Sequence, residues 1–419
     1  MITISRFIKK SLKNLNIQTI KDPRHPKGKR WRLSTLVNAV IMGMASGLKS
    51  LKEVENLTEN LSLPARKLLA IKKRIPDTTL RDFLMKLENK SCLTLLYRSI
   101  HHMRRQKALI PVGLPFGVVA MDGKTTSLKQ AQKEITQKRG EVNVIQTITS
   151  TLTSAATKPC INASLIPPKT NESGHFKAAF DELLNVYGTK LFQVVTYDAG
   201  VTSLENATWV HAHGKNYLLS LKENQKNLHK LAERHLNNVS SRTQLHTQQE
   251  KVSGKIITNT LYSCTSKYLI RNSGWSHLTQ VLMVERKVSD QAGSPTIIGN
   301  RYFVTNLDQS QLNGRQTYQV IRNHWAVENN CHCVFDKSFS EDDRHWIESP
   351  SGNLNILILR RLVYNLLGQF RGRTQRAIWK RNAGWKDLFS RIQINFLQLC
   401  DTVYKRILPH NKGSPQSAT

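Results

Sequence analysis

The sequence predicts an α/β protein in which a mixed sheet follows a helical N-terminal domain and is interrupted by a β-rich insertion. Residues 1–105 have the apolar spacing of helices, residues 115–225 alternate strands with helices, and residues 226–310 contain polar stretches with β-type composition. Helical spacing resumes over residues 311–405, which we assign to the same core as residues 115–225, as its C-terminal helical part. Residues 409–419 are rich in Gly, Ser and Pro, which predicts a disordered tail.

The N-terminal domain is expected to consist of several short helices. Residues 32–45 are apolar almost throughout, which predicts a buried helix, and residues 50–57 follow with helical periodicity. Asp77 or Thr78 is a suitable N-cap for a further helix. Before these helices, residues 21–30 form a basic loop.

The element order of residues 115–225 predicts a ribonuclease-H-like core. Three strands are followed by a helix, a strand, a helix and a last strand. The expected strands are 118–121, 142–152, 160–166, 191–196 and 217–221, and the clearest helix is 174–187. A core of this kind carries acids at the ends of its first and fourth strands. In the insertion, β structure is expected at 255–262, 279–285 and 301–306.

The charge of the chain points to a polyanionic partner. Its 419 residues contain 62 Lys and Arg against 29 Asp and Glu, a formal charge of +33. The basic residues are spread along the whole chain, which suits binding along double-stranded DNA. An ordinary basic protein, for example one associated with ribosomes, is the alternative. No segment is apolar enough to span a membrane and no secretory signal is evident, so we expect a cytoplasmic, nucleoid-associated protein.

Three carboxylates form the candidate catalytic site. Asp122 and Asp198 each end an apolar run that reads as a strand, and Glu328 lies in a helical segment. Two Mg²⁺ ions about 3.5–4 Å apart, held by such acids, can activate an attacking oxygen and stabilise a leaving oxygen in phosphoryl transfer. We expect Mn²⁺ to substitute. For each acid taken alone, an ordinary strand-end or helix-capping role remains the alternative.

The six cysteines favour neither a disulfide framework nor a zinc site. They are scattered along a long chain that lacks secretory features. Only Cys331-His332-Cys333 invites a zinc interpretation, and no second Cys/His pair complements it.

Four short sequence segments around the three acids resemble the motifs of one known family. They occur in the order Ala120-Met121-Asp122-Gly123-Lys124-Thr125, Val195-Thr196-Tyr197-Asp198-Ala199, Tyr217-Leu218-Leu219-Ser220-Leu221-Lys222-Glu223-Asn224-Gln225 and Arg322-Asn323-His324-Trp325-Ala326-Val327-Glu328-Asn329. Together they resemble the bacterial insertion-sequence DDE transposases of the H-repeat-associated (ISAs) type. The resemblance extends over residues 15–370, including an N-terminal region like the domain associated with this family.

This resemblance implies a DNA transposase with a ribonuclease-H-like catalytic domain and two divalent ions, held by Asp122, Asp198 and Glu328. It also implies that residues 169–172 correspond to an Asn-Glu turn after the third strand. The chain departs from the family pattern at residues 253–255, at Glu223 and at Cys333, and none of these departures removes a metal ligand.

Further residues in and near the last of these segments, 322–329, are candidate DNA contacts. His324, Glu328 and His332 are spaced four residues apart and therefore share one helical stripe. His324 is expected to approach a phosphate, with a packing or surface histidine as the alternative. Trp325 and Asn329 form a neighbouring stripe, in which Trp325 either stacks on a base or belongs to the core.

Basic and amide side chains complete the predicted DNA interface. Arg322 and Arg344 are candidate phosphate clamps, although either could be solvated or paired with a carboxylate. Lys124 and Lys222 follow strands that end at the active-site edge. The remaining candidates are amides that make polar contacts or stabilise turns, Asn224 and Gln225.

Two further acids have a less specific role. Asp336 and Asp342 are candidates for acids that support the metal ligands, and a salt bridge is the default interpretation for both.

The predicted function is therefore cut-and-paste DNA transposition. The partners are the two element ends and a target DNA, and bringing two ends together favours a homodimer. We expect no small-molecule cofactor and no covalent protein–DNA intermediate. The alternatives are a stand-alone metal-dependent nuclease and a catalytically dead DNA-binding regulator of the element, because fold alone does not determine function.

Overall fold

A computed structural model describes residues 4–289, 296–374 and 384–393. The predicted tail, residues 409–419, and the end of the predicted segment 311–405 lie outside these residues. Contacts divide the chain into two units: Leu96–Asp336, and a second unit that combines Met1–Leu95 with Lys337–Thr419.

The second unit is helical. Its helix α13 (Pro350–Gln369) is buried along almost its whole length and packs against two helices of the N-terminal region. The helices of this region are α1 (Ile4–Asn14), α2 (Leu33–Ala45), α3 (Leu51–Asn60), α4 (Leu63–Leu69), α5 (Asp77–Lys86) and the first turns of α6 (Asn89–Arg105), of which α2 and α5 contact α13. The apolar run at 32–45 thus forms the expected buried helix.

The boundary between the two units falls at Lys337, inside the segment 311–405 that the sequence analysis assigned to the core. The reason lies in α13, which is buried on every side. Such a helix needs partners all round, and α2 and α5 are among them. Spacing along the sequence cannot reveal which partners a helix buried on every side takes.

The first unit is built on a mixed sheet with the predicted ribonuclease-H-like topology. Strand β1 pairs antiparallel with β3 and parallel with β5, β3 pairs antiparallel with β4 and with the short β2, and β5 pairs parallel with β6. These strands are β1 (Val118–Leu128), β2 (Gln137–Arg139), β3 (Val142–Leu152), β4 (Cys160–Leu165), β5 (Val194–Tyr197) and β6 (Asn216–Leu221). The spatial order β4-β3-β1-β5-β6 confirms the fold class.

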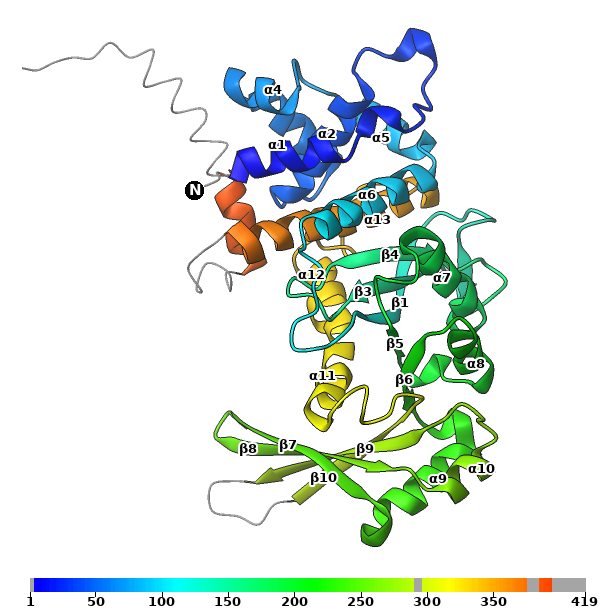
Figure 1. The fold of residues 1–419 in the computed structure, drawn as a ribbon. Coiled ribbons are helices and arrows are strands. Elements are labelled where there is room, and N and C mark those ends of the chain that lie inside the picture. The colour runs from blue at the N-terminus through cyan, green and yellow to red at the C-terminus, as the bar shows by residue number, and fades with distance from the viewer. Residues whose placement is uncertain (1–3, 290–295, 375–383, 394–419) are drawn as a thin grey trace, which may run out of the picture. The chain divides into compact units, whose positions relative to one another are not determined.

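Alternation along the strands gives the sheet two buried faces. Val119 and Val195 belong to the core cluster that includes apolar residues of α7 (Glu172–Tyr187) and α8 (Leu204–Ala212). Their neighbours Val118 and Val194 face the other way, toward α11 (Gly314–His324). Helices therefore cover the sheet on both sides, α7 and α8 on one and α11 on the other (Figure 1). This arrangement keeps the strand ends at a defined edge.

The β-rich insertion continues the core sheet. Strand β10 (Thr296–Thr305) pairs antiparallel with β6, and β9, β8 and β7 follow in order. The bounds of these strands are β9 (Gln280–Ser289), β8 (Lys255–Cys264) and β7 (Thr243–Val252), and the accompanying helices are α9 (Lys226–Asn237) and α10 (Lys267–Ser273). Strand β7 was not predicted, because its residues are polar and mostly exposed.

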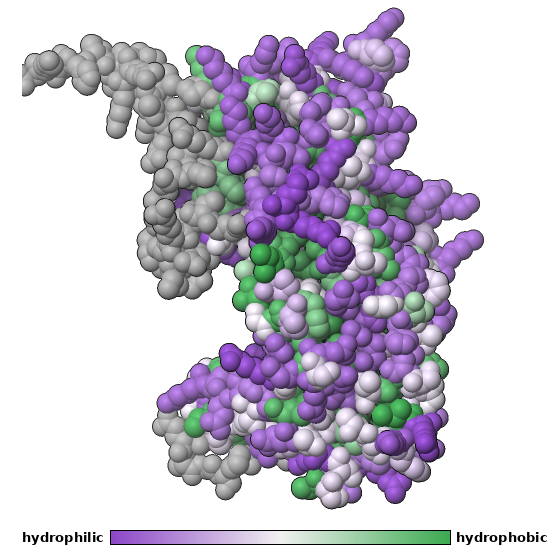
Figure 2. Space-filling model, in the orientation of Figure 1, coloured by the Kyte–Doolittle hydropathy of each residue, from purple (hydrophilic) through white to green (hydrophobic). Residues whose placement is uncertain are grey.

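Hydrophilic residues dominate the face of the molecule shown in Figure 2, with apolar residues in smaller areas between them. This surface agrees with the composition, in which charged residues make up 22% of the chain. In the part of the chain that the structure describes, no helix combines the length and the apolar character needed to cross a membrane.

Candidate active site

Asp122 lies where β1 loses one of its neighbours. Residues Val118–Ala120 pair with β5, and this parallel ladder ends before Asp122. On its other side β1 continues to pair with β3, opposite Thr149 at the position of Asp122. The strand is therefore longer than the predicted 118–121. Asp122 does not end the strand, but it stands just beyond the end of the β1–β5 ladder, with its side chain 15% exposed.

Asp198 follows β5 directly and caps the short helical turn Ala199–Val201. Its Oδ1 accepts a hydrogen bond of 2.9 Å from the backbone N–H of Gly200. Asn224 holds this turn by donating from Nδ2 to the carbonyls of Ala199 (2.7 Å) and Thr202 (3.1 Å). Asn224 thus lies at the predicted edge, and its observed contacts are with the turn that positions Asp198.

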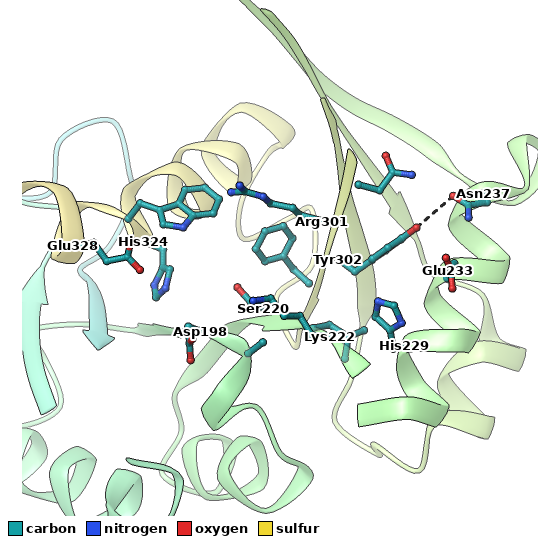
Figure 3. Close-up of a pocket in the computed structure, with 15 residues that line it drawn as sticks. Asp198, Ser220, Lys222, His229, Glu233, Asn237, Arg301, Tyr302, His324 and Glu328 are labelled. Carbon is teal, nitrogen blue, oxygen red and sulfur yellow. Dashed lines mark hydrogen bonds between the residues drawn. The ribbon is translucent and has the colours of Figure 1, made fainter. Parts of the chain in front are cut away.

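Glu328 lies in a π-helical turn. After α11, which begins with a capping box formed by Asn313 and Gln316, the chain continues into the π-helix Val327–His332 and then α12 (Cys333–Lys337). π-Helical turns are rare and occur frequently at functional sites. The Glu328 side chain is exposed and faces the cavity between the sheet edge and the insertion (Figure 3). Local sequence spacing, which predicted an ordinary helix here, does not reveal such a turn.

The side chains of the predicted stripe gather around Asp122. The Nδ1 atom of His332 lies 3.3 Å from Oδ2 of Asp122. Burial lowers the pKa of His324, against smaller raising effects of the charges of Asp122 and Asp198. His324 is 5% exposed and its Nδ1 lies 2.9 Å from Oγ1 of Thr196, so this histidine is part of the protein interior beside the site.

The carboxylates of the site influence one another. Partial loss of solvent around Glu328, which is still an exposed residue, raises its pKa, and the charges of Asp122 and Asp198 raise it further, while His332 and Arg301 lower it. These acids therefore share one electrostatic environment that disfavours their combined negative charge. Among the described residues, no three His, Cys, Asp or Glu side chains form a ready-made metal site. The oxygen donors and their mutual repulsion nevertheless suit hard divalent cations.

A fourth acid, Glu172, belongs to the same environment. Burial raises its pKa, and Asp122 and then Asp198 raise it further. Glu172 is the first residue of α7, which follows β4 after the connecting residues 166–171. The sequence analysis treated residues 169–172 only as a turn typical of the family. The topology offers the missing signal, because β4 runs parallel to β1 and β5, so a helix that follows β4 begins at the edge where the other acids lie.

Lys124 and Asp336 form an ion pair. Nζ of Lys124 donates to Oδ1 of Asp336 over 2.6 Å, and the lysine side chain is only 6% exposed. The lysine predicted to contact DNA thus lies at the site but its ammonium group is tied to this acid. Asp336 forms the salt bridge that the sequence analysis took as its default role.

A cavity of about 610 Å³ adjoins the acids. Asp198, His324 and Glu328 lie on one side of it, and side chains of the insertion lie on the other (Figure 3). Lys222 and Arg301, both exposed basic residues, also line it. Arg301 was missed by the sequence analysis, and its guanidinium stacks 4.8 Å from the ring centre of half-buried Trp325. Its cavity-lining position depends on the β10–β6 pairing, which sequence spacing does not reveal.

The remaining predicted residues lie at different distances from this cavity. Asn329 is exposed beside Glu328, and Gln225 is half-buried at the end of the turn that follows β6. Arg322 lies 3.8 Å from Glu250 and lines a second cavity of about 200 Å³. Arg344 lies in the other contact unit, where its carbonyl accepts a hydrogen bond from Arg360, and it is therefore described apart from the site.

Two family profiles match the chain. The profile described as transposase DDE domain matches residues 114–366, and the profile described as DDE_Tnp_1-associated matches residues 16–98. Similar proteins of Escherichia coli (strain K12) include "Putative protein YbfL" and "H repeat-associated putative transposase YhhI". Each is 26% identical over 234 residues, which cover 54% of this chain and 57% of the relative. The match thus spans less than two thirds of either relative.

Among solved structures, a piggyBac transposase synaptic complex with hairpin DNA, determined by cryo-EM, is similar at 12% identity and a TM-score of 0.42. The match covers 99% of this chain and 85% of that one.

Proposed function

The chain belongs to the transposase DDE domain family, and from this premise we propose that it is a DNA transposase that cuts the ends of its element and joins them to target DNA. The observation that carries the proposal is the convergence of Asp122, Asp198 and Glu328 at one edge of the sheet, beside a cavity lined by Lys222 and Arg301. Acids that can hold divalent ions, on a chain with a formal charge of +33, are suited to the cleavage of a phosphodiester.

We assign two Mg²⁺ ions, replaceable by Mn²⁺, to the three acids. Asp122, Asp198 and Glu328 would hold these ions between them. When bound, such ions activate the attacking oxygen and neutralise charge on the leaving oxygen. Asn224 keeps the Asp198 turn in place through its two hydrogen bonds. His332 fixes the orientation of the Asp122 carboxylate.

The reaction consists of two displacements at phosphorus. In the first, a water oxygen bonds to phosphorus at the element end, and the bond to the 3′-oxygen breaks to leave a free 3′-hydroxyl. In the second, that hydroxyl attacks a target phosphodiester and displaces another 3′-oxygen. Lys222 and Arg301 would contact the phosphates of the strand in the cavity.

The N-terminal domain, residues 1–105, is assigned to recognition of the element ends, and the β-rich insertion, residues 226–310, to holding the DNA that enters the cavity. Pairing of two ends requires two copies of the chain, which we propose form a homodimer on DNA. We place the protein on the bacterial nucleoid in the cytoplasm. Size measurement by light scattering, with and without DNA carrying the element end, tests the dimer.

The nuclease alternative and the regulator alternative differ from transposition in their products. We would incubate the purified chain with Mg²⁺, DNA ends from the flanks of its own gene and a supercoiled target plasmid. Transposition predicts joined products that disappear in Glu328→Gln. Cleavage without joining would favour the nuclease, and binding without cleavage would favour the regulator. The presence of all three acids disfavours the regulator.

A further inference from the structure

We propose that the second cavity, of about 200 Å³, binds a phosphate of the DNA strand that occupies the neighbouring cavity beside the acids. Three arginines from separate elements of the fold line this second cavity: Arg286 on β9, Arg301 on β10 and Arg322 on α11. The inference rests on the proposed function, since it takes DNA as the partner of the chain.

The two cavities share part of their lining. Asn300, Arg301 and Trp325 line both of them. Arg301 reaches from β10 toward the helix that carries His324 and Glu328 (Figure 3), and its guanidinium lies over the Trp325 ring. This pair therefore lies at the boundary of the two cavities. A nucleic acid strand that passes it can present one phosphate to the acids and a neighbouring one to the second cavity.

The register of the insertion leaves open space beside Arg286. Arg286 pairs with Asn259 of β8 on one side and with Gly299 of β10 on the other, next to a β-bulge in β10. A Cβ atom placed on Gly299 would meet no atom within 4 Å. The cavity volume of about 200 Å³ is several times the ~30 Å³ that a water molecule takes up in the liquid, so a phosphate group fits.

The helical wall of the second cavity is apolar at its base. Tyr318, Ile321, Arg322 and Trp325 are spaced three, one and three residues apart, which places them on one face of α11 and its end. Tyr318 and Ile321 are buried and belong to the same apolar cluster as Val284 of β9. Such a base lowers the local dielectric constant, which strengthens the attraction between a guanidinium and a phosphate.

The positive charge of the second cavity has little compensation from acids. Among the described residues that line it, none is acidic. Arg322 lies 3.8 Å from Glu250, and because both side chains are at least a third exposed, this pair contributes little. Glu285, the neighbour of Arg286 in β9, is buried and contacts Lys287 instead. Guanidinium groups around an open space match the oxygens of a phosphate in charge and geometry.

The test is a binding cycle between the arginines and single phosphates. The probe is a duplex from the flank of the chain's own gene, made in versions that each carry one neutral methylphosphonate near the element end. Binding is measured without divalent ions, so that the DNA stays uncut. We expect Arg286→Ala combined with Arg322→Ala to weaken binding of the unmodified duplex about 10-fold and to lower its salt dependence by about one phosphate. On the version whose contacted phosphate is neutral, this loss should disappear.

The matched control is Arg234→Ala combined with Arg271→Ala. It removes two exposed arginines, on α9 and α10, that line neither cavity. The control should bind every version of the duplex like the unmodified chain. An equal loss in the control would overturn the inference, and so would a loss in the cavity variant that persists on every version of the duplex.

Gly299→Val tests the second cavity without removing a charge. The new side chain would occupy the open space beside Arg286, and a β-branched residue suits a strand. We expect a loss of about 10-fold that disappears on the same version of the duplex. Binding like that of the unmodified chain would contradict the inference. If the arginine variant does not fold, which thermal unfolding would reveal, Gly299→Val decides the question by itself.

The joining assay distinguishes failure of this inference from failure of the proposed function. Joined products that depend on Glu328, together with normal DNA binding by the arginine variant and by Gly299→Val, would reject the phosphate site alone. Absence of cleavage and joining by the unmodified chain would reject the proposed function, while the binding cycle would still decide whether a DNA phosphate occupies the second cavity.

Discussion

Two sets of acids, one from each contact unit of this chain, have opposite surroundings. In the helical unit, Glu55 contacts Lys52 and Arg74, and Glu341 contacts Arg360 and Arg361. In the sheet unit, Glu172 and Glu328 lie near other acids, and their pKa values are raised. The pKa of Glu55, by contrast, is lowered to about 2 by hydrogen bonds from its cationic neighbours. Paired acids of the first kind hold a fold together, whereas acids that repel one another suit a site that binds a cation.

The largest expected effect comes from the sheet unit. Asp122→Asn, Asp198→Asn and Glu328→Gln should each reduce DNA cleavage by at least about 10³-fold, because each removes stabilisation of the charge that develops in the reaction. DNA binding should remain nearly unchanged. Single-turnover cleavage measured alongside an electrophoretic binding assay checks both. Retained cleavage in any one variant would remove that residue from the site.

Glu341→Gln should produce the largest loss of stability. Glu341, Arg360 and Arg361 are all at most 1% exposed, and the Arg361 Nη1 atom lies 2.9 Å from a Glu341 oxygen. Neutralising the acid leaves two buried cations uncompensated, at a cost of about 3 kcal/mol. Guanidinium unfolding followed by circular dichroism measures it. A variant as stable as the unmodified chain would show that the pairing in this unit is not what stabilises it.

Glu55→Gln should have a smaller, pH-dependent effect of about 1–2 kcal/mol at pH 7, through the loss of hydrogen bonds to a charged group. The folded-state pKa of about 2 lies below the unfolded value of about 4.3. The stabilisation is therefore fully present above the unfolded pKa and is lost as the pH falls toward 2. Urea unfolding at pH 7, 4 and 3 should show the difference between variant and unmodified chain shrinking. A constant difference would contradict the assignment.

Arg301→Ala should have the smallest effect. Removing one phosphate contact should weaken DNA binding by about 2–5-fold and lower the salt dependence of binding by about one phosphate. Arg271→Ala, on α10 outside the cavity, is the matched control. Titrations at several salt concentrations measure both quantities. Equal losses in the two variants would mean that the cavity side of the insertion makes no particular contact.

Local patterns predicted most of the core. The strand expected at 142–152 and the one expected at 160–166 agree with β3 and β4 almost residue for residue, because β3 is rich in Val, Ile and Thr and both segments are largely buried. The extension of β1 to Leu128 was not predicted, since its second half is more polar and is held by β3 alone. The pattern of side chains along a segment indicates which residues are buried. The strand with which that segment pairs depends on residues elsewhere in the chain.

The three candidate acids were predictable because each belongs to a periodic segment of the sequence. Asp122 and Asp198 follow apolar runs and Glu328 lies in a helical segment, so their positions could be read from the sequence. Glu172 and Arg301 come to the site through topology, by way of the parallel β4 and the β10–β6 ladder. A Cβ atom added to Gly123 would meet the carboxylate of Glu172, 49 positions further along the chain (172 − 123), and no local pattern encodes this proximity.

The hydrogen-bonded ladder that runs from β2 through the core to β7 has a mechanical consequence. Arg301 on β10 and Asp198 after β5 lie on opposite sides of the cavity and are joined through the paired strands β5, β6 and β10. The spacing of these strands is set by backbone hydrogen bonds. Under the proposed function, a DNA strand between Asp198 and Arg301 would meet two walls that belong to one continuous sheet.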